Sequence, residues 1–266
     1  INRKEPLFNI NQFSYTLDRP KQQVQHLLFK AKYAYNLTVN DQLQVLVSHQ
    51  ENKRQEFDLA RITDAPELDL KIGTTLVDAN YEAKRNRWQW QPGVQVMIQN
   101  NVWSGSRFFI PNFESNNIAA YFIGKHNTTK VDAEMGIRYD TRQLTSFRNI
   151  NGNIRSITEN WKGASASAGV TFKITPHFQW LVNAATAWRA PGVNELYVNG
   201  LHHGTSSFEI GDANLQAERA YNLSTQLKYK VADSALVVDV TLYHNFIDGF
   251  INLVPDTPAT LTIRGA

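Results

Sequence analysis

The sequence contains no cysteine among its 266 residues, which excludes disulfide bonds, thiolate metal sites, iron–sulfur clusters and thiol catalysis. It also lacks any run of about 18 apolar residues, the length that a membrane-spanning helix requires. The net charge is only +3, and the charged residues are spread along the chain, so nucleic acid is not expected as a partner. The hydrophobic fraction of 42% nevertheless predicts a folded chain rather than a disordered one.

Alternation of apolar and polar side chains is the dominant pattern, and it is typical of β-strands with one apolar face. It is unbroken over residues 131–140, where the apolar set is Val131, Ala133, Met135, Ile137 and Tyr139. Further segments of this kind lie at 166–174, 221–229 and 236–243, with weaker copies at 29–37, 43–47, 68–76, 88–98 and 178–188. No long helical segment with a cap is evident. The sequence predicts an all-β protein.

The connections between these segments alternate in length. Short turns are expected near 40–41, 79–87, 126–128, 175–177 and 232–234, and long polar stretches at 50–66, 100–113, 143–160 and 190–217. In an antiparallel up-and-down sheet, every second connection lies at the same end, so short turns gather at one end and long loops at the other. This asymmetry is typical of an outer-membrane β-barrel. The alternative is a soluble β-sandwich binding module, for instance for carbohydrate.

Aromatic residues lie near the ends of the expected strands, where a membrane barrel carries its interfacial girdle. In such a barrel the apolar residues of 131–139 are expected to face lipid. The polar residues Gln95, Gln99, Asp132, Glu134 and Arg138 are expected on the lumen side, where they line the interior or contact a plug.

The stretch Trp188-Arg189-Ala190-Pro191, followed by Glu195-Leu196-Tyr197, resembles a signature of TonB-dependent outer-membrane receptors. There, an aromatic-Arg-Ala-Pro sequence leaves a barrel strand and enters a long loop. The continuation Asp212-Ala213-Asn214-Leu215 and Glu218 is similar to the second box of the family, with alanine in place of a proline. Segments 107–113 and 136–140 also resemble sequences found in members of the family.

The resemblance implies a barrel of about 22 strands with an N-terminal plug. About eleven or twelve strands are predicted here, so residues 1–266 are expected to be a segment of one barrel domain, about half of it and without the plug. It further implies the outer membrane of a Gram-negative bacterium, contact with its lipid, and a link to TonB through a plug domain absent from this chain. The implied function is import of a scarce chelated nutrient, above all a ferric siderophore, with haem or another metal complex as the alternative.

Candidate ligand-binding residues gather in the 190–217 loop. His202 and His203 carry imidazoles that suit iron or copper, and because strand neighbours face opposite sides, His203 is the one favoured by its motif position. Arg189, Glu195 and Glu209 could bind an anionic iron chelate by charge-assisted hydrogen bonds. The alternative is that the histidines are ordinary surface residues and that the charges brace the loop. No cofactor and no metal site of the protein's own is expected.

Catalytic templates are missing from the sequence. It has no Gly-x-Ser-x-Gly elbow, phosphate loop, His-Glu-x-x-His or dinucleotide glycine motif, and its carboxylates are scattered. The chain is therefore expected not to be an enzyme and to have no catalytic residues. A barrel enzyme of the outer membrane stays open as an alternative, because folding alone could assemble a Ser-His-Asp triad.

Overall fold

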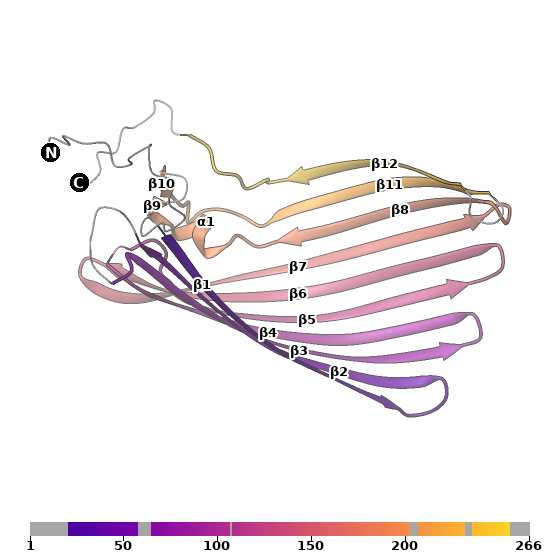
Figure 1. Ribbon diagram of the computed structural model, residues 1–266, viewed down its shortest axis with the longest axis horizontal. Helices are drawn as coiled ribbons and strands as arrows, with labels where there is room; N and C mark the ends of the chain where they lie inside the picture. Colours follow the sequence, from indigo (N-terminus) through magenta and orange to yellow (C-terminus); the bar gives the residue numbers. More distant parts are fainter. Residues whose placement is uncertain (1–20, 58–64, 107, 203–206, 232–235, 256–266) are drawn as a thin grey trace, which may run out of the picture.

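The computed structural model describes residues 21–57, 65–106, 108–202, 207–231 and 236–255. Ten long strands form one sheet in which every neighbouring pair is antiparallel, in the order β1-β2-β3-β4-β5-β6-β7-β8-β11-β12 (Figure 1). They are β1 (Lys21–Asn36), β2 (Asp41–Phe57), β3 (Leu68–Arg85), β4 (Trp88–Ser104), β5 (Asn112–Asn127), β6 (Val131–Ile150), β7 (Asn153–Lys173), β8 (Phe178–Arg189), β11 (Glu218–Lys230) and β12 (Val237–Asp248). The predicted all-β, up-and-down topology is confirmed.

The sheet is curved and open, as expected for part of a barrel (Figure 1). β1 and β12 are its two edges, and they do not pair with each other in the part of the chain that the structure describes. The strands contain from 12 to 21 residues, more than the roughly 9–11 residues that a strand needs to cross a bilayer. The sheet has ten strands among the described residues, against the eleven or twelve predicted, and two short strands form a separate hairpin in the segment predicted as a loop.

Short turns gather at one end of the sheet and the longer connections at the other, as the sequence predicts, except that the β6–β7 connection at the second end is also short. The predicted turn at 232–234 lies outside the described residues. Tight turns at 37–40, 86–87, 128–130 and 174–177 define the turn end, on the right in Figure 1. At the other end, the loop end, the segment between β8 and β11 folds into helix α1 (Val193–Tyr197) and a hairpin of β9 (Asn199–His202) and β10 (Ser207–Ile210). No helix of the described residues is long and apolar enough to cross a membrane.

The predicted long loop at 143–160 is wrong. β6 and β7 continue through this region and pair up to Ile150 and Asn153, joined by a two-residue turn. Asn151 (φ 53°) and Gly152 (φ 82°) both adopt the positive φ that a tight hairpin of this hand requires. Residues 50–57 and 100–104, also predicted as loop, belong to β2 and β4. These extensions are rich in polar residues, and their few apolar residues, such as Leu144, Phe147 and Ile154, do not alternate regularly, so the pattern does not reveal them.

The two faces of the sheet differ in polarity. We call the face on which α1 packs, through Leu144 of β6, the inner face. Arg138 lies on this inner face, because residues two apart in a strand share a face. On the opposite, outer face the apolar residues of β6 are exposed, with Met135 at 49% and Ile137 at 57%. The sheet therefore has the expected apolar outer face and polar inner face.

Candidate ligand-binding site at the loop end

Helix α1 is anchored at the loop end by a small apolar core. Leu196 and Val193 are almost fully buried, together with Phe113 of β5 and Leu144 of β6. Gly192 caps the start of the helix, and its backbone N–H donates to Glu195 Oε2 at 2.6 Å, so this carboxylate satisfies an N–H that the helix leaves without an internal partner. The core holds α1 against the inner face of the sheet.

Arg142 of β6 reaches the chain just before the helix. Its Nη1 lies 3.3 Å from the carbonyl oxygen of Pro191, and its Nε donates to Ser115 Oγ at 3.2 Å. The guanidinium also lies 6.0 Å from the ring centroid of Trp161. Arg142 therefore ties the start of the α1 segment to β5 and β7.

Arg189, a predicted ligand residue, is held by two carboxylates. Its Nη1 lies 2.8 Å from Oε2 of Glu195, and its Nε donates to Oε1 of Glu218 at 2.8 Å. Glu218 in turn accepts from the backbone N–H of Ile251 at 3.1 Å. These contacts link the end of β8 to α1, to the start of β11 and to the segment after β12. The interpretation that these charges brace the loop is confirmed for Arg189 and Glu195, whereas binding of a ligand by them stays a prediction.

The remaining predicted ligand residues lie on the β9–β10 hairpin or beside it. Glu209 lies in β10, where Ser207 Oγ donates to its Oε1 at 3.3 Å. His202 is the last residue of β9, opposite Ser207. His203 lies outside the described residues. The structure therefore brings Arg189 and Glu195 together and places Glu209 on the hairpin that follows α1.

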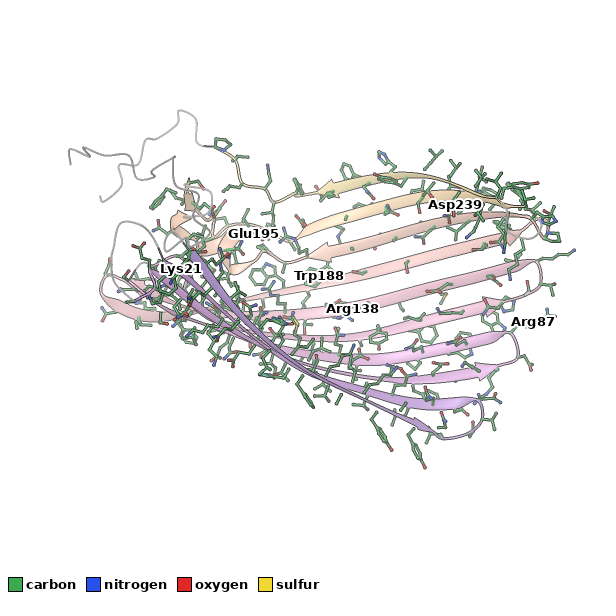
Figure 2. All side chains as sticks on the ribbon, in the orientation of Figure 1. Lys21, Arg87, Arg138, Trp188, Glu195 and Asp239 are labelled. Carbon is green, nitrogen blue, oxygen red and sulfur yellow. The ribbon has the colours of Figure 1, made fainter. Side chains whose placement is uncertain are left out.

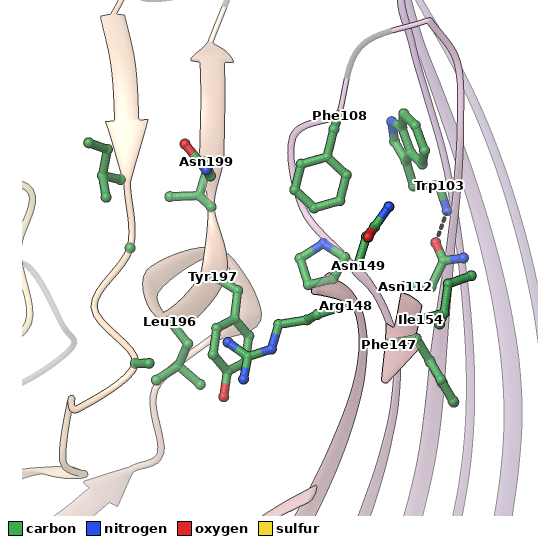
Figure 3. A pocket seen from close by; sticks show the side chains of 15 residues that line it. Trp103, Phe108, Asn112, Phe147, Arg148, Asn149, Ile154, Leu196, Tyr197 and Asn199 are labelled. Carbon is green, nitrogen blue, oxygen red and sulfur yellow. Dashed lines mark hydrogen bonds between the residues drawn. The ribbon is translucent and has the colours of Figure 1, made fainter. Parts of the chain in front are cut away.

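A cavity of about 730 Å³ opens between this segment and the strands, and sequence reasoning did not find it (Figure 3). Its lining comes from the β4–β5 connection, the β6–β7 hairpin, and α1 with the chain that follows: Trp103, Phe108, Pro111, Asn112, Phe147, Arg148, Asn149, Ile154, Leu196, Tyr197, Val198, Asn199, Ile210, Gly211 and Ala213. The lining joins segments more than 100 residues apart, so no local motif marks it. Several lining residues lie in family-like segments, among them Leu196, Tyr197 and Ala213, but Trp103 and the β6–β7 hairpin residues do not.

Arg148 and Tyr197 form the polar part of this cavity. The guanidinium carbon of Arg148 lies 4.3 Å from the centroid of the Tyr197 ring, a cation–π contact. The Tyr197 hydroxyl donates to Glu159 of β7. Burial, and then this hydrogen bond to Glu159, raise the pKa of Tyr197 to about 12. Tyr197 is therefore a neutral hydrogen-bond donor at any physiological pH.

The inner face below the site carries a connected set of polar side chains. Arg138 donates to Asp140 at 2.9 Å and to Gln95 at 2.8 Å, and Gln95 donates to Asp78 at 3.2 Å. Asp78 also accepts from the Tyr121 hydroxyl at 3.0 Å. Figure 2 shows Arg138 between Glu195 at the loop end and Arg87 at the turn end. A hydrogen-bonded polar surface thus runs from the loop-end site toward the turn end.

The sequence as a whole now identifies the family. Residues 4–264 match the β-barrel domain of TonB dependent receptor-like proteins. The chain belongs to the TonB-dependent receptor family. Receptors of this family are outer-membrane β-barrels rather than enzymes, and the open ten-stranded sheet is part of such a barrel.

Solved structures share this fold at low sequence identity. The FrpB iron transporter from Neisseria meningitidis is 15% identical over 86% of this chain and 36% of its own, with a TM-score of 0.63. The siderophore receptor PiuA from Acinetobacter baumannii is 12% identical over 85% of this chain and 40% of its own, with a TM-score of 0.64. The hemophore receptor HasR from Serratia marcescens, solved with its hemophore and heme, is 14% identical over 87% of this chain and 44% of its own, with a TM-score of 0.52. The chain thus spans less than half the length of these structures.

Proposed function

We propose that the TonB-dependent receptor containing this chain imports a metal chelate across the outer membrane, with a ferric chelate of the siderophore type as substrate. The observation that carries the proposal is the match of residues 4–264 to the receptor barrel, combined with the site at the loop end. The names of FrpB and PiuA, an iron transporter and a siderophore receptor, agree with an iron chelate.

The arrangement of faces supports transport by a barrel in lipid. Exposed apolar residues such as Met135 and Ile137 cover the outer face, which hydrocarbon would solvate. The inner face carries charged and amide side chains linked by hydrogen bonds, such as Arg138 and Gln95, which suit a wet lumen or a plug that fills it. In this proposal the chain is one part of the barrel domain, and the receptor engages TonB through a plug encoded elsewhere in the protein.

The loop-end site is proposed to face the extracellular medium and to receive the chelate. Long loops lie outside and short turns lie in the periplasm in barrels of this kind. Arg189 and Glu195 pair with each other and brace α1, whereas Glu209 and His202 belong to the β9–β10 hairpin that follows it. His203 is the next residue in the sequence after His202. We propose that Glu209, His202 and His203 contact the ligand from the extracellular side.

Binding to the purified intact receptor tests the substrate class. Ferric chelates with hydroxamate, carboxylate or catecholate arms and haem are titrated separately, and metal-free chelators serve as controls. We expect at least one ferric chelate to bind with a dissociation constant in the micromolar range or below, and haem to bind weakly. Failure of every ferric chelate to bind would contradict the proposal.

Haem is the second candidate, because the 190–217 segment carries His202 and His203, and the similar HasR structure contains heme. A bound haem reports its iron ligands through its absorption spectrum. A spectrum typical of histidine ligation that is lost in His203→Ala would favour haem over a siderophore. A chelate that binds equally well to wild type and to a variant with His202, His203 and Arg189 all replaced would contradict the ligand role of these residues.

A further inference from the structure

The loop-end cavity combines apolar walls with one cationic side chain (Figure 3). Its volume of about 730 Å³ is in the range of sites that bury a small molecule. The rings of Trp103 and Phe108 meet edge to face, with centroids 5.5 Å apart and planes at 71°. Phe108 is 45% exposed and Ile210 is 67% exposed, so apolar surface is available. These walls suit a flat apolar group.

Arg148 provides the charge in this cavity. Its side chain extends across the Tyr197 ring in Figure 3, with the guanidinium carbon 4.3 Å from the ring centroid. Its Nε is buried and has no hydrogen-bond partner among the described residues. A buried donor without an acceptor is unfavourable, so a ligand that brings an acceptor to this point is favoured.

A second arginine lies opposite Arg148 in the β6–β7 hairpin. Arg155 is the register partner of Arg148 across the β6–β7 hairpin, so both side chains leave the same face. Like charges directly opposite each other destabilise a sheet, and Arg148 and Arg155 are such a pair. Glu159 is the one carboxylate of β7, and it accepts from the Tyr197 hydroxyl. An anionic ligand group would relieve this repulsion.

We propose that the cavity binds an aromatic arm of the imported chelate, a flat ring that carries a carboxylate or phenolate. The ring stacks against Trp103 and Phe108, and the anionic oxygen accepts hydrogen bonds from Arg148. Assignment of this arm to an iron chelate rests on the proposed function, whereas the preference for an aromatic anion rests on the cavity itself.

Salicylate and salicylamide are the probes, because they share a ring and hydroxyl but differ in the carboxylate. Each is titrated into the purified intact receptor by calorimetry, with citrate as an anion that has no aromatic ring. We expect salicylate to bind at least about 10-fold more tightly than salicylamide or citrate, as one charge-assisted hydrogen bond would provide. Equal binding of the three, or no binding of salicylate because another segment of the receptor fills the cavity, would overturn the proposal.

Variants at Arg148 separate ligand recognition from folding. Arg148→Gln should abolish the preference for salicylate and leave salicylamide binding unchanged, and Arg148→Lys should restore part of the preference. Arg87→Gln makes the same chemical change at the turn end, far from the cavity in Figure 2, and should have no effect. A preference that persists in Arg148→Gln would overturn the proposal.

Different results would overturn the proposed import function and the proposed aromatic-anion site. A receptor that takes up ferric chelates but shows no preference for salicylate would overturn the cavity assignment and leave the import function standing. A receptor that prefers salicylate through Arg148 but takes up no ferric chelate would overturn the import function and support the aromatic-anion site.

Discussion

The indole ring of Trp188 lies directly over Gly163, across the β7–β8 boundary where the two strands cease to pair. A Cβ atom at Gly163 would be 2.0 Å from Cδ2 of Trp188. The absence of a side chain at this position is therefore what allows the tryptophan of the Trp-Arg-Ala-Pro motif to lie flat against the sheet. Arg189, the next residue, ends β8, and its side chain forms an ion pair with Glu195.

Gly163→Ala is expected to destabilise the barrel by about 1–3 kcal/mol, because the rigid ring of Trp188 must move to make room. The free energy of unfolding of the intact receptor in detergent and urea measures the loss. Gly136→Ala is the matched control in β6, where the added Cβ would lie 3.2 Å from the Ser167 hydroxyl, a small group that can rotate away. Equal losses in the two variants would contradict the role of Gly163.

Arg142→Gln is expected to loosen the α1 segment, because it removes the contacts to the carbonyl oxygens of Ala190 and Pro191 and the packing on Trp161. Hydrogen exchange measures this effect at the N–H of Leu196, which donates to the Gly192 carbonyl at 3.0 Å. Exchange there should accelerate by about 5- to 30-fold, as loss of about 1–2 kcal/mol implies. Unchanged exchange in α1 would show that its apolar core alone holds it.

Tyr197 should titrate only at extreme pH. Its pKa of about 12 in the folded state lies above the ordinary value of about 10, so the folded state retains the proton longer than the unfolded state. Its contribution to stability is then complete below pH of about 10 and is lost as the pH rises through the folded-state value. The titration of Tyr197 is obtained as the difference in tyrosinate absorbance between wild type and Tyr197→Phe. A titration midpoint at a pH of about 10 would contradict the burial of Tyr197 and its hydrogen bond to Glu159.

Met135 should face lipid. Because residues 1–266 contain no cysteine, Met135→Cys gives a single site for a spin label within this part of the receptor. The label should be relaxed by oxygen dissolved in the bilayer, whereas a label at Arg138 on the inner face should be relaxed by a water-soluble nickel reagent. In addition, Met135→Arg should cost about 2–4 kcal/mol if the site lies near the bilayer midplane. Access of the nickel reagent to position 135 would reverse the assignment of the faces.

Much of the fold follows from the local pattern. The alternation over 131–140 predicts a strand that is apolar on one face and polar on the other. The structure confirms this for β6, where Met135 lies on the exposed apolar face and Arg138 on the polar inner face. The same rule fails where β6 and β7 extend beyond the apolar band, because the few apolar residues there do not alternate regularly with polar ones. The Asn151-Gly152 pair, with positive φ at both residues, is the signal that could have corrected the predicted loop at 143–160.

The site was less predictable than the fold. Motif resemblance identified Arg189 and Glu195, which the structure joins in an ion pair. Arg148 could not be found, because its partner Tyr197 is 49 residues away along the chain and only the docking of α1 on the inner face brings them together. A five-residue helix is also too short to show a helical period.

Energised iron uptake tests the central claim most directly. Cells that carry the intact receptor, cells that lack it, and cells that lack TonB are given radioactive iron as the chelate that binds most tightly to the purified protein. The account predicts accumulation only when receptor, TonB and proton-motive force are all present, and reduced accumulation in Arg148→Gln for a chelate with an aromatic acid arm. Accumulation that does not change when the receptor is deleted, or that proceeds without TonB, would contradict the account.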